Sequence, residues 1–218
     1  GGTWGSTSSL SNLNQLRLWS FDSFGEDLIA NVRAGGVYYW DTSAKTLGTD
    51  RAVALSALTG ANLTPTKGLQ VLVSDVDRHV IVLGADPISG GSRSGSIDPL
   101  LIAFSDQENP AEWEPRSDNT AGSLRCSAGS EIIGGLRARQ ETLIWTDVAL
   151  YSLQFVGTPL TFGLNLINEG VSLIGPNAAI NTPSGVFWMD KKGFYSYGGN
   201  VTPLPCSVKS YVFDDFNE

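Results

Sequence analysis

Short apolar runs recur along the chain in pairs, and the clearest pair lies between Glu141 and Val156. Residues 143–146 and 150–156 are both rich in β-branched and aromatic residues, and a polar break at Asp147 separates them. Two such runs joined by a few polar residues are typical of a β-hairpin. This stretch therefore predicts two antiparallel strands.

Three further pairs of runs have the same design. They are residues 28–30 with 36–40, 80–83 with 100–104, and 186–189 with 194–197. The last pair is joined by a tight Asp-Lys-Lys-Gly turn at residues 190–193. Four hairpins of one design predict a repeat protein.

Each hairpin has another run beside it that can extend its sheet. Residues 16–21 alternate aliphatic with aromatic positions, which predicts a strand with one face of each kind. Residues 51–55 can add a fourth strand to the same sheet. Comparable runs precede the other three hairpins, at residues 69–74, 130–136 and 177–180.

Two segments differ from this pattern. Residues 86–98 are rich in Gly and Ser and predict a flexible surface insertion within the second hairpin. Residues 109–113, with Pro110 at a first-turn position, are the best helix candidate and predict about one turn. Gly, Pro and β-branched residues interrupt the other windows, so we expect an all-β fold.

The spacing of the hairpins predicts a β-propeller-like fold of about four blade-like antiparallel sheets. Equivalent positions of the hairpins recur at intervals near the roughly 40 to 50 residues of a four-stranded blade. One blade cannot bury both faces and must stack on neighbours, and closure usually takes more than four, so we expect part of a larger propeller and of a longer protein. Residues 1–13 are expected to be a linker or the end of a preceding module. The propeller is expected at residues 14–218, with units at 14–60, 61–120, 121–174 and 175–218.

The charge balance limits the classes of function that suit the chain. The formal net charge is -8 at pH 7 and the 22 acidic residues are scattered along the chain. A sequence-independent nucleic-acid binder needs clustered Lys and Arg, so this balance argues against one. It is typical of a solvated acidic surface, and it also suits a surface past which DNA slides without binding.

Neither a membrane span nor a metal site is predicted. No apolar run approaches the roughly 18 residues of a spanning helix, and residues 1–9 have neither the basic region nor the apolar core that would predict a signal peptide. Cys126 and Cys206 are far apart, with no CxxC pattern and no nearby His, which gives a zinc or redox site little support. Two buried thiols are favoured over a disulfide between them.

His79 is the only histidine, and it follows Asp75 and Asp77 at an expected strand start. A histidine beside a carboxylate can serve as a general base. A histidine in an acidic turn is more often simply solvated, and we favour that interpretation.

Aspartates recur directly after apolar runs. Carboxylates gathered on one rim could serve glycoside hydrolysis or calcium binding. Asp at a strand end also accepts hydrogen bonds from turn amides, and we favour this structural role. The residues are Asp22, Asp41, Asp75, Asp106, Asp147 and Asp190.

Two other patterns are compatible with a site. Residues 91–95 read Gly-Ser-Arg-Ser-Gly, the letters of a nucleophile elbow, but they lack the strand-to-helix context, so no nucleophile is predicted. Aromatic residues on the hairpin strands could build a sugar-stacking platform, although packing between blades is favoured. These are Tyr39, Trp40, Trp145, Tyr151, Trp188 and Tyr195.

Several segments, in order along the chain, resemble the β-propeller tail-tube or nozzle proteins of short-tailed bacteriophages. They are residues 18–31, 36–41, 104–113, 139–147, 201–206 and 211–216. The resemblance implies a non-enzymatic virion tail protein without catalytic, cofactor-binding or metal-binding residues. It also implies a homo-oligomeric ring, a hexamer in that family, that contacts portal or adaptor and tail-fibre proteins while genomic DNA passes through.

Two alternatives stay open. A carbohydrate- or receptor-binding propeller would expose a cluster of aromatic side chains on one face. A glycoside hydrolase would need two carboxylates roughly 5 to 10 Å apart in one pocket.

Overall fold

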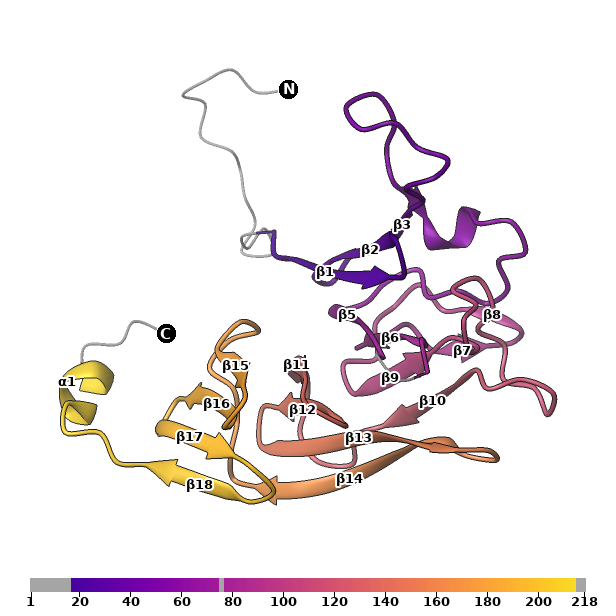
Figure 1. The fold of residues 1–218 in the computed structure, drawn as a ribbon. Coiled ribbons are helices and arrows are strands. Elements are labelled where there is room, and N and C mark those ends of the chain that lie inside the picture. Colours follow the sequence, from indigo (N-terminus) through magenta and orange to yellow (C-terminus); the bar gives the residue numbers. More distant parts are fainter. Residues whose placement is uncertain (1–16, 75–76, 215–218) are drawn as a thin grey trace.

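A computed structural model describes residues 17–74 and 77–214, and the regular secondary structure of these residues is almost entirely β-strand. The strands form four antiparallel sheets of four strands each, and one small two-stranded sheet. Figure 1 shows the four large sheets arranged in chain order around an open arc. The expected all-β fold with blade-like sheets is confirmed.

The first two sheets each run from the inside of the arc to its outside (Figure 1). Sheet 1 contains β1 (Trp19–Phe24), β2 (Asp27–Val32), β3 (Val37–Trp40) and β4 (Val53–Ala54), and a 3-10 turn, η1 (Leu55–Ala57), follows it. Sheet 2 contains β5 (Gln70–Val73), β6 (Val80–Leu83), β9 (Leu101–Phe104) and β10 (Gly122–Arg125).

The other two sheets have the same meander order. Sheet 3 contains β11 (Ile132–Arg137), β12 (Thr142–Thr146), β13 (Ala149–Gly157) and β14 (Thr161–Glu169). Sheet 4 contains β15 (Ala179–Thr182), β16 (Gly185–Asp190), β17 (Gly193–Tyr197) and β18 (Val201–Leu204), and α1 (Lys209–Asp214) follows it.

All four predicted hairpins pair as expected. Leu28 lies opposite Trp40 in the first hairpin, and Trp145 lies opposite Leu150 in the third. The strands β10, β14 and β18 were not predicted, because they lie on the outer side of their sheets and carry weaker apolar patterns. Since β10 pairs with β9, sheet 2 extends to Arg125 and not to the expected boundary at residue 120.

Two local predictions need correction. Residues 109–113 form turns and bridges, with Glu112 beside Asn62, and the described α-helix is α1. The insertion at residues 86–98 is mostly exposed, as expected, but it contains the strands β7 (Ile88–Ser89) and β8 (Ser92–Arg93). Asp86 at the base of the insertion is fully buried and accepts hydrogen bonds from the Thr66 and Gly95 N–H groups. These bonds hold in place an insertion that was predicted to be flexible.

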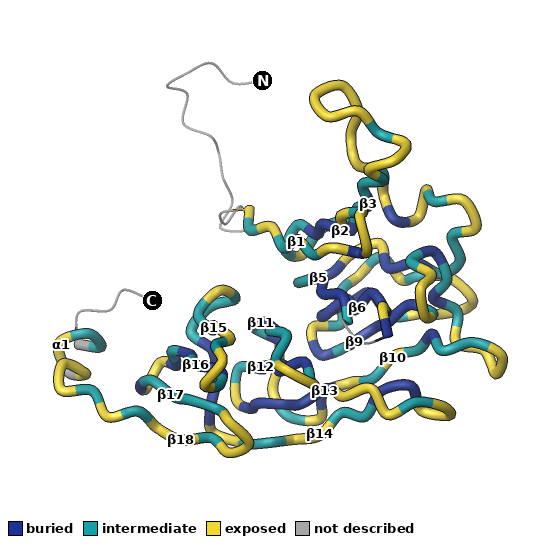
Figure 2. Tube along the Cα trace, viewed as in Figure 1, coloured by how far each residue is buried: buried dark blue, intermediate teal, exposed yellow. Residues whose placement is uncertain are grey.

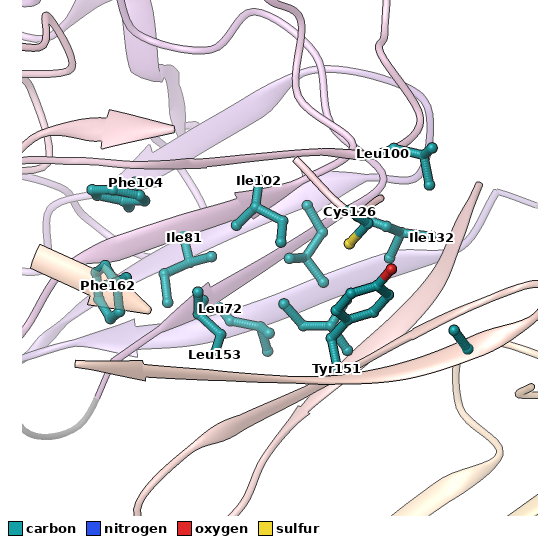
Figure 3. Close-up of a cluster of buried hydrophobic side chains, with 13 residues drawn as sticks. Leu72, Ile81, Leu100, Ile102, Phe104, Cys126, Ile132, Tyr151, Leu153 and Phe162 are labelled. Carbon is teal, nitrogen blue, oxygen red and sulfur yellow. The ribbon is translucent and has the colours of Figure 1, made fainter. Parts of the chain in front are cut away.

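Buried residues lie where successive sheets face each other (Figure 2), and their apolar side chains form three clusters between the sheets. Period-2 alternation sends neighbouring residues of a strand to opposite faces, so both faces of sheets 2 and 3 are buried. On β6, Val80 and Val82 pack toward sheet 1, whereas Ile81 and Leu83 pack toward sheet 3. Figure 3 shows the interface between sheets 2 and 3, where Ile81 and Ile102 lie near Leu153 and Phe162. Stacking of faces is therefore what holds the arc together.

Candidate functional site

The inner strands of neighbouring sheets meet along the inside of the arc. The strands β1, β5, β11 and β15 are each the first strand of a sheet; β1 contacts β5, β5 contacts β11, and β11 contacts β15. A first strand pairs on one side only within its sheet, so its other edge has backbone groups that need partners. Side chains of the neighbouring inner strand supply several of these partners.

Sheets 1, 2 and 3 are joined by polar side chains at this edge. The hydroxyl of Ser20 accepts the Val71 N–H at 3.0 Å, and the carboxylate of Asp22 accepts the Val73 N–H at 2.7 Å. Arg137 donates to the Val73 carbonyl at 3.2 Å and lies 3.1 Å from the Asp22 carboxylate. The two charges therefore neutralise each other while they satisfy the edge of β5.

A side-chain amide joins β5 to β11. Gln70 donates to the Gly135 carbonyl at 2.8 Å and accepts the Gly135 N–H at 2.8 Å. A Cβ on Gly135 would lie 2.6 Å from a methyl carbon of Leu83, so the position favours glycine. On sheet 4, Asn181 donates to the Arg137 carbonyl at 3.0 Å. We call the side chains of Ser20, Asp22, Gln70, Arg137 and Asn181 the axial network.

Replacing Gln70 with alanine is expected to destabilise the protein by about 1–3 kcal/mol, because the N–H and carbonyl of Gly135 lose their side-chain partner. Chemical denaturation of both forms measures the difference. Gln154→Ala is the matched control at an exposed position, with an expected change within about 0.5 kcal/mol. Equal stabilities for Gln70→Ala and wild type would contradict a structural role for this amide pair.

A pocket of about 210 Å³ lies beside the axial network, where sheets 1 and 2 meet the loop between β14 and β15. Its lining combines aromatic rings with polar groups and includes Trp19, Phe21, Arg33, Gln70 and Asn177. Burial lowers the pKa of the Arg33 guanidinium, and the nearby Glu131 charge opposes this shift. Arg33 donates to the Ile132 carbonyl at 3.4 Å, so it also ties sheet 1 to sheet 3.

Two aromatic rings beside this pocket are half-exposed. Trp19 is 47% exposed and Phe21 is 59% exposed. Their ring planes are 6° apart and their centroids are separated by 5.8 Å, and Tyr38 lies 6.2 Å from Trp19. Neither ring was among the aromatic residues proposed from the hairpins. Stacked, accessible rings of this kind offer an apolar docking surface.

The hairpin aromatics themselves mainly pack between sheets, as favoured from the sequence. Tyr39, Tyr151, Trp145 and Trp188 are buried in the three cores, and Tyr195 packs against the third. Trp40 differs, because it alternates with buried Tyr39 and lies on the outer face of sheet 1.

His79 is fully buried, so the expectation that it is solvated is wrong. Its Nδ1 contacts the Asp77 carboxylate, and its Nε2 lies 2.9 Å from the Thr120 hydroxyl. The rings of Phe104 and Phe162 pack against the imidazole at centroid distances of 6.4 Å and 5.2 Å. Asp75 lies outside the described residues.

This arrangement has the order hydroxyl, imidazole, carboxylate, but its hydrogen bonds point the wrong way for nucleophilic catalysis. The Thr120 hydroxyl lies 2.6 Å from an Asp106 oxygen, which accepts its hydrogen. His79 Nε2 must then donate to Thr120, and a base that is already protonated at Nε2 cannot take the hydroxyl proton. We therefore assign His79, Asp77 and Thr120 to a buried structural network.

The described aspartates of the recurring set bond to backbone amides, as favoured. Asp41 accepts the amides of Ser43 and Ala44, and Asp190 accepts the Lys191 amide at 2.5 Å. Burial alone would raise the pKa of Asp106, but hydrogen bonds from Thr120 and the Gln107 amide outweigh it and lower that pKa. A lowered pKa is the opposite of what the general acid of a glycoside hydrolase needs.

Asp147 closes the loop that enters β11. Its carboxylate accepts the Ser130 N–H and the Ser130 hydroxyl, each at 2.7 Å. Burial opposes ionisation of Asp147, yet these bonds and the Glu131 amide give a net lowering of its pKa. The polar break that separates the clearest pair of apolar runs is therefore an anchor for the preceding loop.

The lowered pKa of Asp147 predicts a dependence of stability on pH. A carboxylate whose pKa is lower when folded stabilises the protein above its unfolded value, about 3.9, and this contribution is lost as pH falls through the folded value. Asp147→Asn should therefore flatten the fall in stability below about pH 4, and Ser130→Ala should flatten it partly. Denaturation midpoints across this pH range measure the effect. If the curves of stability against pH were parallel for Asp147→Asn and wild type, this role of Asp147 would be contradicted.

The remaining sequence candidates do not form a site. Residues 91–95 lie in the exposed β7–β8 hairpin, without a strand-to-helix turn. Both cysteines are free; Cys126 is buried and Cys206 is half-buried, and burial raises the pKa of Cys126 to about 12. Within residues 17–74 and 77–214, no three His, Cys, Asp or Glu side chains are grouped to hold a metal ion. No helix of the described chain is long and apolar enough to cross a membrane.

No protein-family model matches the chain, and a search of curated proteins finds no similar sequence.

Proposed function

We propose that this chain is a non-enzymatic structural module of a short-tailed bacteriophage tail, belonging to the nozzle through which DNA leaves the particle. The observation that carries the proposal is the stack of four sheets whose inner edges are tied by the axial network. Such a stack suits a stiff wall, because both the apolar interfaces and the edge hydrogen bonds resist separation of the sheets. The ordered resemblance of the segments to nozzle proteins supports the same assignment.

The accessible charge suits a channel that DNA passes without binding. Glu26, Asp50, Glu108 and Asp118 are exposed, and the chain carries a net charge of -8. A surface of this sign repels a phosphate backbone, whereas binding would need clustered cations. The tail ring, its hexameric number and its portal, adaptor and fibre contacts belong to this proposal.

A duplex-DNA retention assay at near-physiological salt tests the channel role. The wild-type chain is expected to leave DNA mobility unchanged. A variant with Lys at Glu26, Asp50, Glu108 and Asp118 is the matched control, and it is expected to retain DNA at low salt and release it as salt rises. Retention of duplex DNA by the wild type would contradict a channel surface that DNA slides past.

A second candidate, a carbohydrate-binding propeller, is favoured by one observation. Trp19 and Phe21 form a half-exposed aromatic pair beside a pocket that also contains Arg33 and Gln70. Aromatic faces with a few polar groups are the usual composition of a sugar site. A glycan screen with tryptophan fluorescence as readout separates the two candidates, because the structural module is expected to give no sugar-dependent change.

A further inference from the structure

The β13–β14 hairpin continues beyond the rest of sheet 3 as a two-stranded ribbon. The pairing between β12 and β13 ends with Thr142 opposite Leu153, whereas β13 and β14 stay paired as far as Gly157 and Thr161. Figure 1 shows this ribbon projecting past β12. Residues 154–163 therefore form an arm with no third described strand beside it.

The end of this arm, residues 155–160, exposes apolar side chains, and we call it the ribbon tip. Leu160 is 70% exposed, Val156 is 53% exposed and Phe155 is 40% exposed. Residues 148–168 contain no Asp, Glu, Lys, Arg or His, so the ribbon tip carries no charge of its own. Clustered exposed apolar side chains mark an interaction site.

The base of the ribbon is fixed against sheet 2. Phe162 is buried, and its ring centroid lies 5.2 Å from that of His79 and 4.9 Å from that of Phe104. The Thr161 hydroxyl donates to the Thr120 carbonyl at 3.0 Å. The ribbon tip therefore cannot fold back to bury its apolar side chains without breaking these contacts.

The ribbon tip offers few polar groups to a partner. The Leu160 carbonyl accepts the Phe162 N–H at 2.7 Å, and Pro159 has no N–H. Thr158 supplies the only polar side chain of the tip. A protein groove recognises a loop partly through hydrogen bonds, which these side chains hardly provide. An apolar lipid layer instead requires an uncharged segment whose backbone groups are paired.

An acidic loop lies beside the ribbon tip. Thr158 lines a surface pocket together with Asp106, Glu108 and Asp118. Residues 104–121 contain five acidic residues and one Arg, so the loop stays net acidic although exposed arginines pair with Glu108 and Asp118. Such a loop is repelled by anionic lipid headgroups, and zwitterionic headgroups do not repel it.

We propose that the ribbon tip inserts into the outer part of a zwitterionic lipid bilayer, without spanning it. Val156, Pro159 and Leu160 leave water in this contact, which is the driving force. One tip is a weak anchor, because even a single lipid chain gives only marginal, reversible membrane binding. A ring of chains presents several tips to one bilayer and binds it more strongly, but the contact is a property of each chain and does not depend on the ring.

Vesicle flotation at high lipid concentration tests the contact. The full chain is expected to float with phosphatidylcholine vesicles. Leu160→Asp is expected to lower the partition coefficient by about tenfold or more, because a carboxylate replaces an apolar side chain, and Leu160→Phe is expected to keep it. Leu47→Asp is the control, since Leu47 is 90% exposed on the β3–β4 loop, and it is expected to bind as wild type does. Circular dichroism confirms that the variants keep the β fold.

A fluorescent label shows whether the ribbon tip itself enters the lipid. Leu160→Cys in a Cys206→Ser background provides the labelling site, because the remaining Cys126 is buried. The emission of an environment-sensitive dye at this position is expected to shift to the blue with vesicles, and nitroxide groups on the acyl chains are expected to quench it. The same dye on Leu47→Cys is expected to stay unchanged.

Vesicles of equal parts phosphatidylcholine and phosphatidylglycerol test the acidic loop. Wild type is expected to bind them more weakly than phosphatidylcholine alone at low salt, and the difference is expected to narrow as salt rises. Glu108→Gln combined with Asp118→Asn is expected to restore binding. Asp50→Asn combined with Glu169→Gln removes the same charge away from the ribbon tip, and it is expected to restore less.

Four results would overturn the proposal. They are a wild type that does not float with phosphatidylcholine vesicles, equal flotation of Leu160→Asp and wild type, a label at position 160 that stays in water while the chain floats, and tighter binding to the anionic vesicles. The first result would leave a protein groove as the occupant. None of these results bears on the bacteriophage assignment, which has its own test.

Discussion

Replacing Trp145 with alanine is expected to lower the free energy of unfolding by about 3–5 kcal/mol, the usual range for loss of a buried tryptophan side chain. Trp145 is fully buried between sheets 3 and 4, and its ring meets that of Trp188 at a centroid distance of 5.5 Å. Truncation would leave a cavity in the core that attaches the last sheet. Chemical denaturation with intrinsic fluorescence measures the loss.

Trp145→Phe is the matched control for this substitution. The indole N–H of Trp145 has no hydrogen-bond partner among the described residues, so a phenyl ring keeps the packing without breaking a hydrogen bond. The expected loss is on the order of 1 kcal/mol. If alanine and phenylalanine were equally tolerated, the attachment of sheet 4 would not depend on this core.

Replacing Asp77 with alanine is expected to cost about 3–5 kcal/mol, the range for removing one partner of a buried pair. His79 would lose the carboxylate at Nδ1, and the Ser74 hydroxyl would lose its acceptor. The imidazole could not reach water, because it is fully buried. Denaturation at neutral pH measures the change in midpoint at constant slope.

Asp77→Asn separates the hydrogen bond from the charge. The asparagine amide can donate to the unprotonated Nδ1 of a neutral His79, while Nε2 still donates to Thr120. This variant is therefore expected to lose only about 1 kcal/mol of unfolding free energy.

Glu108→Ala is the control at an exposed ion pair, in which the Glu108 carboxylate lies 3.9 Å from the Arg78 guanidinium. It is expected to cost no more than about 1 kcal/mol. Equal losses for Asp77→Ala and Glu108→Ala would contradict the buried network.

The hairpins were predictable because their signals are local. Residues 143–146 and 150–156 are rich in β-branched and aromatic residues on both sides of Asp147, and each strand is largely buried. The strand β10 reads Gly-Ser-Leu-Arg and β18 contains Pro203, so neither has a strong apolar or β-branched pattern. These outer strands form because the neighbouring strand offers an unpaired edge. That edge exists only in the assembled sheet, so the sequence of an outer strand alone does not reveal it.

The polar contacts could not be predicted for a related reason. Gln70 and Gly135 are 65 positions apart, and His79 and Thr120 are 41 positions apart. A single Gln, Thr or Gly has no local signature that identifies such a partner. The exposed pair of Trp19 and Phe21 was partly visible in the alternation of residues 16–21, but only the arc leaves that aromatic face uncovered.

The measurement that tests the proposed role most directly is immunogold electron microscopy of purified short-tailed virions that encode this chain, with antibodies raised against it. The proposal predicts gold at the far end of the tail, and none on the capsid or on host membranes. Label confined to the capsid would contradict a place in the tail nozzle. Unlabelled particles in which mass spectrometry does not detect the chain would contradict it as well.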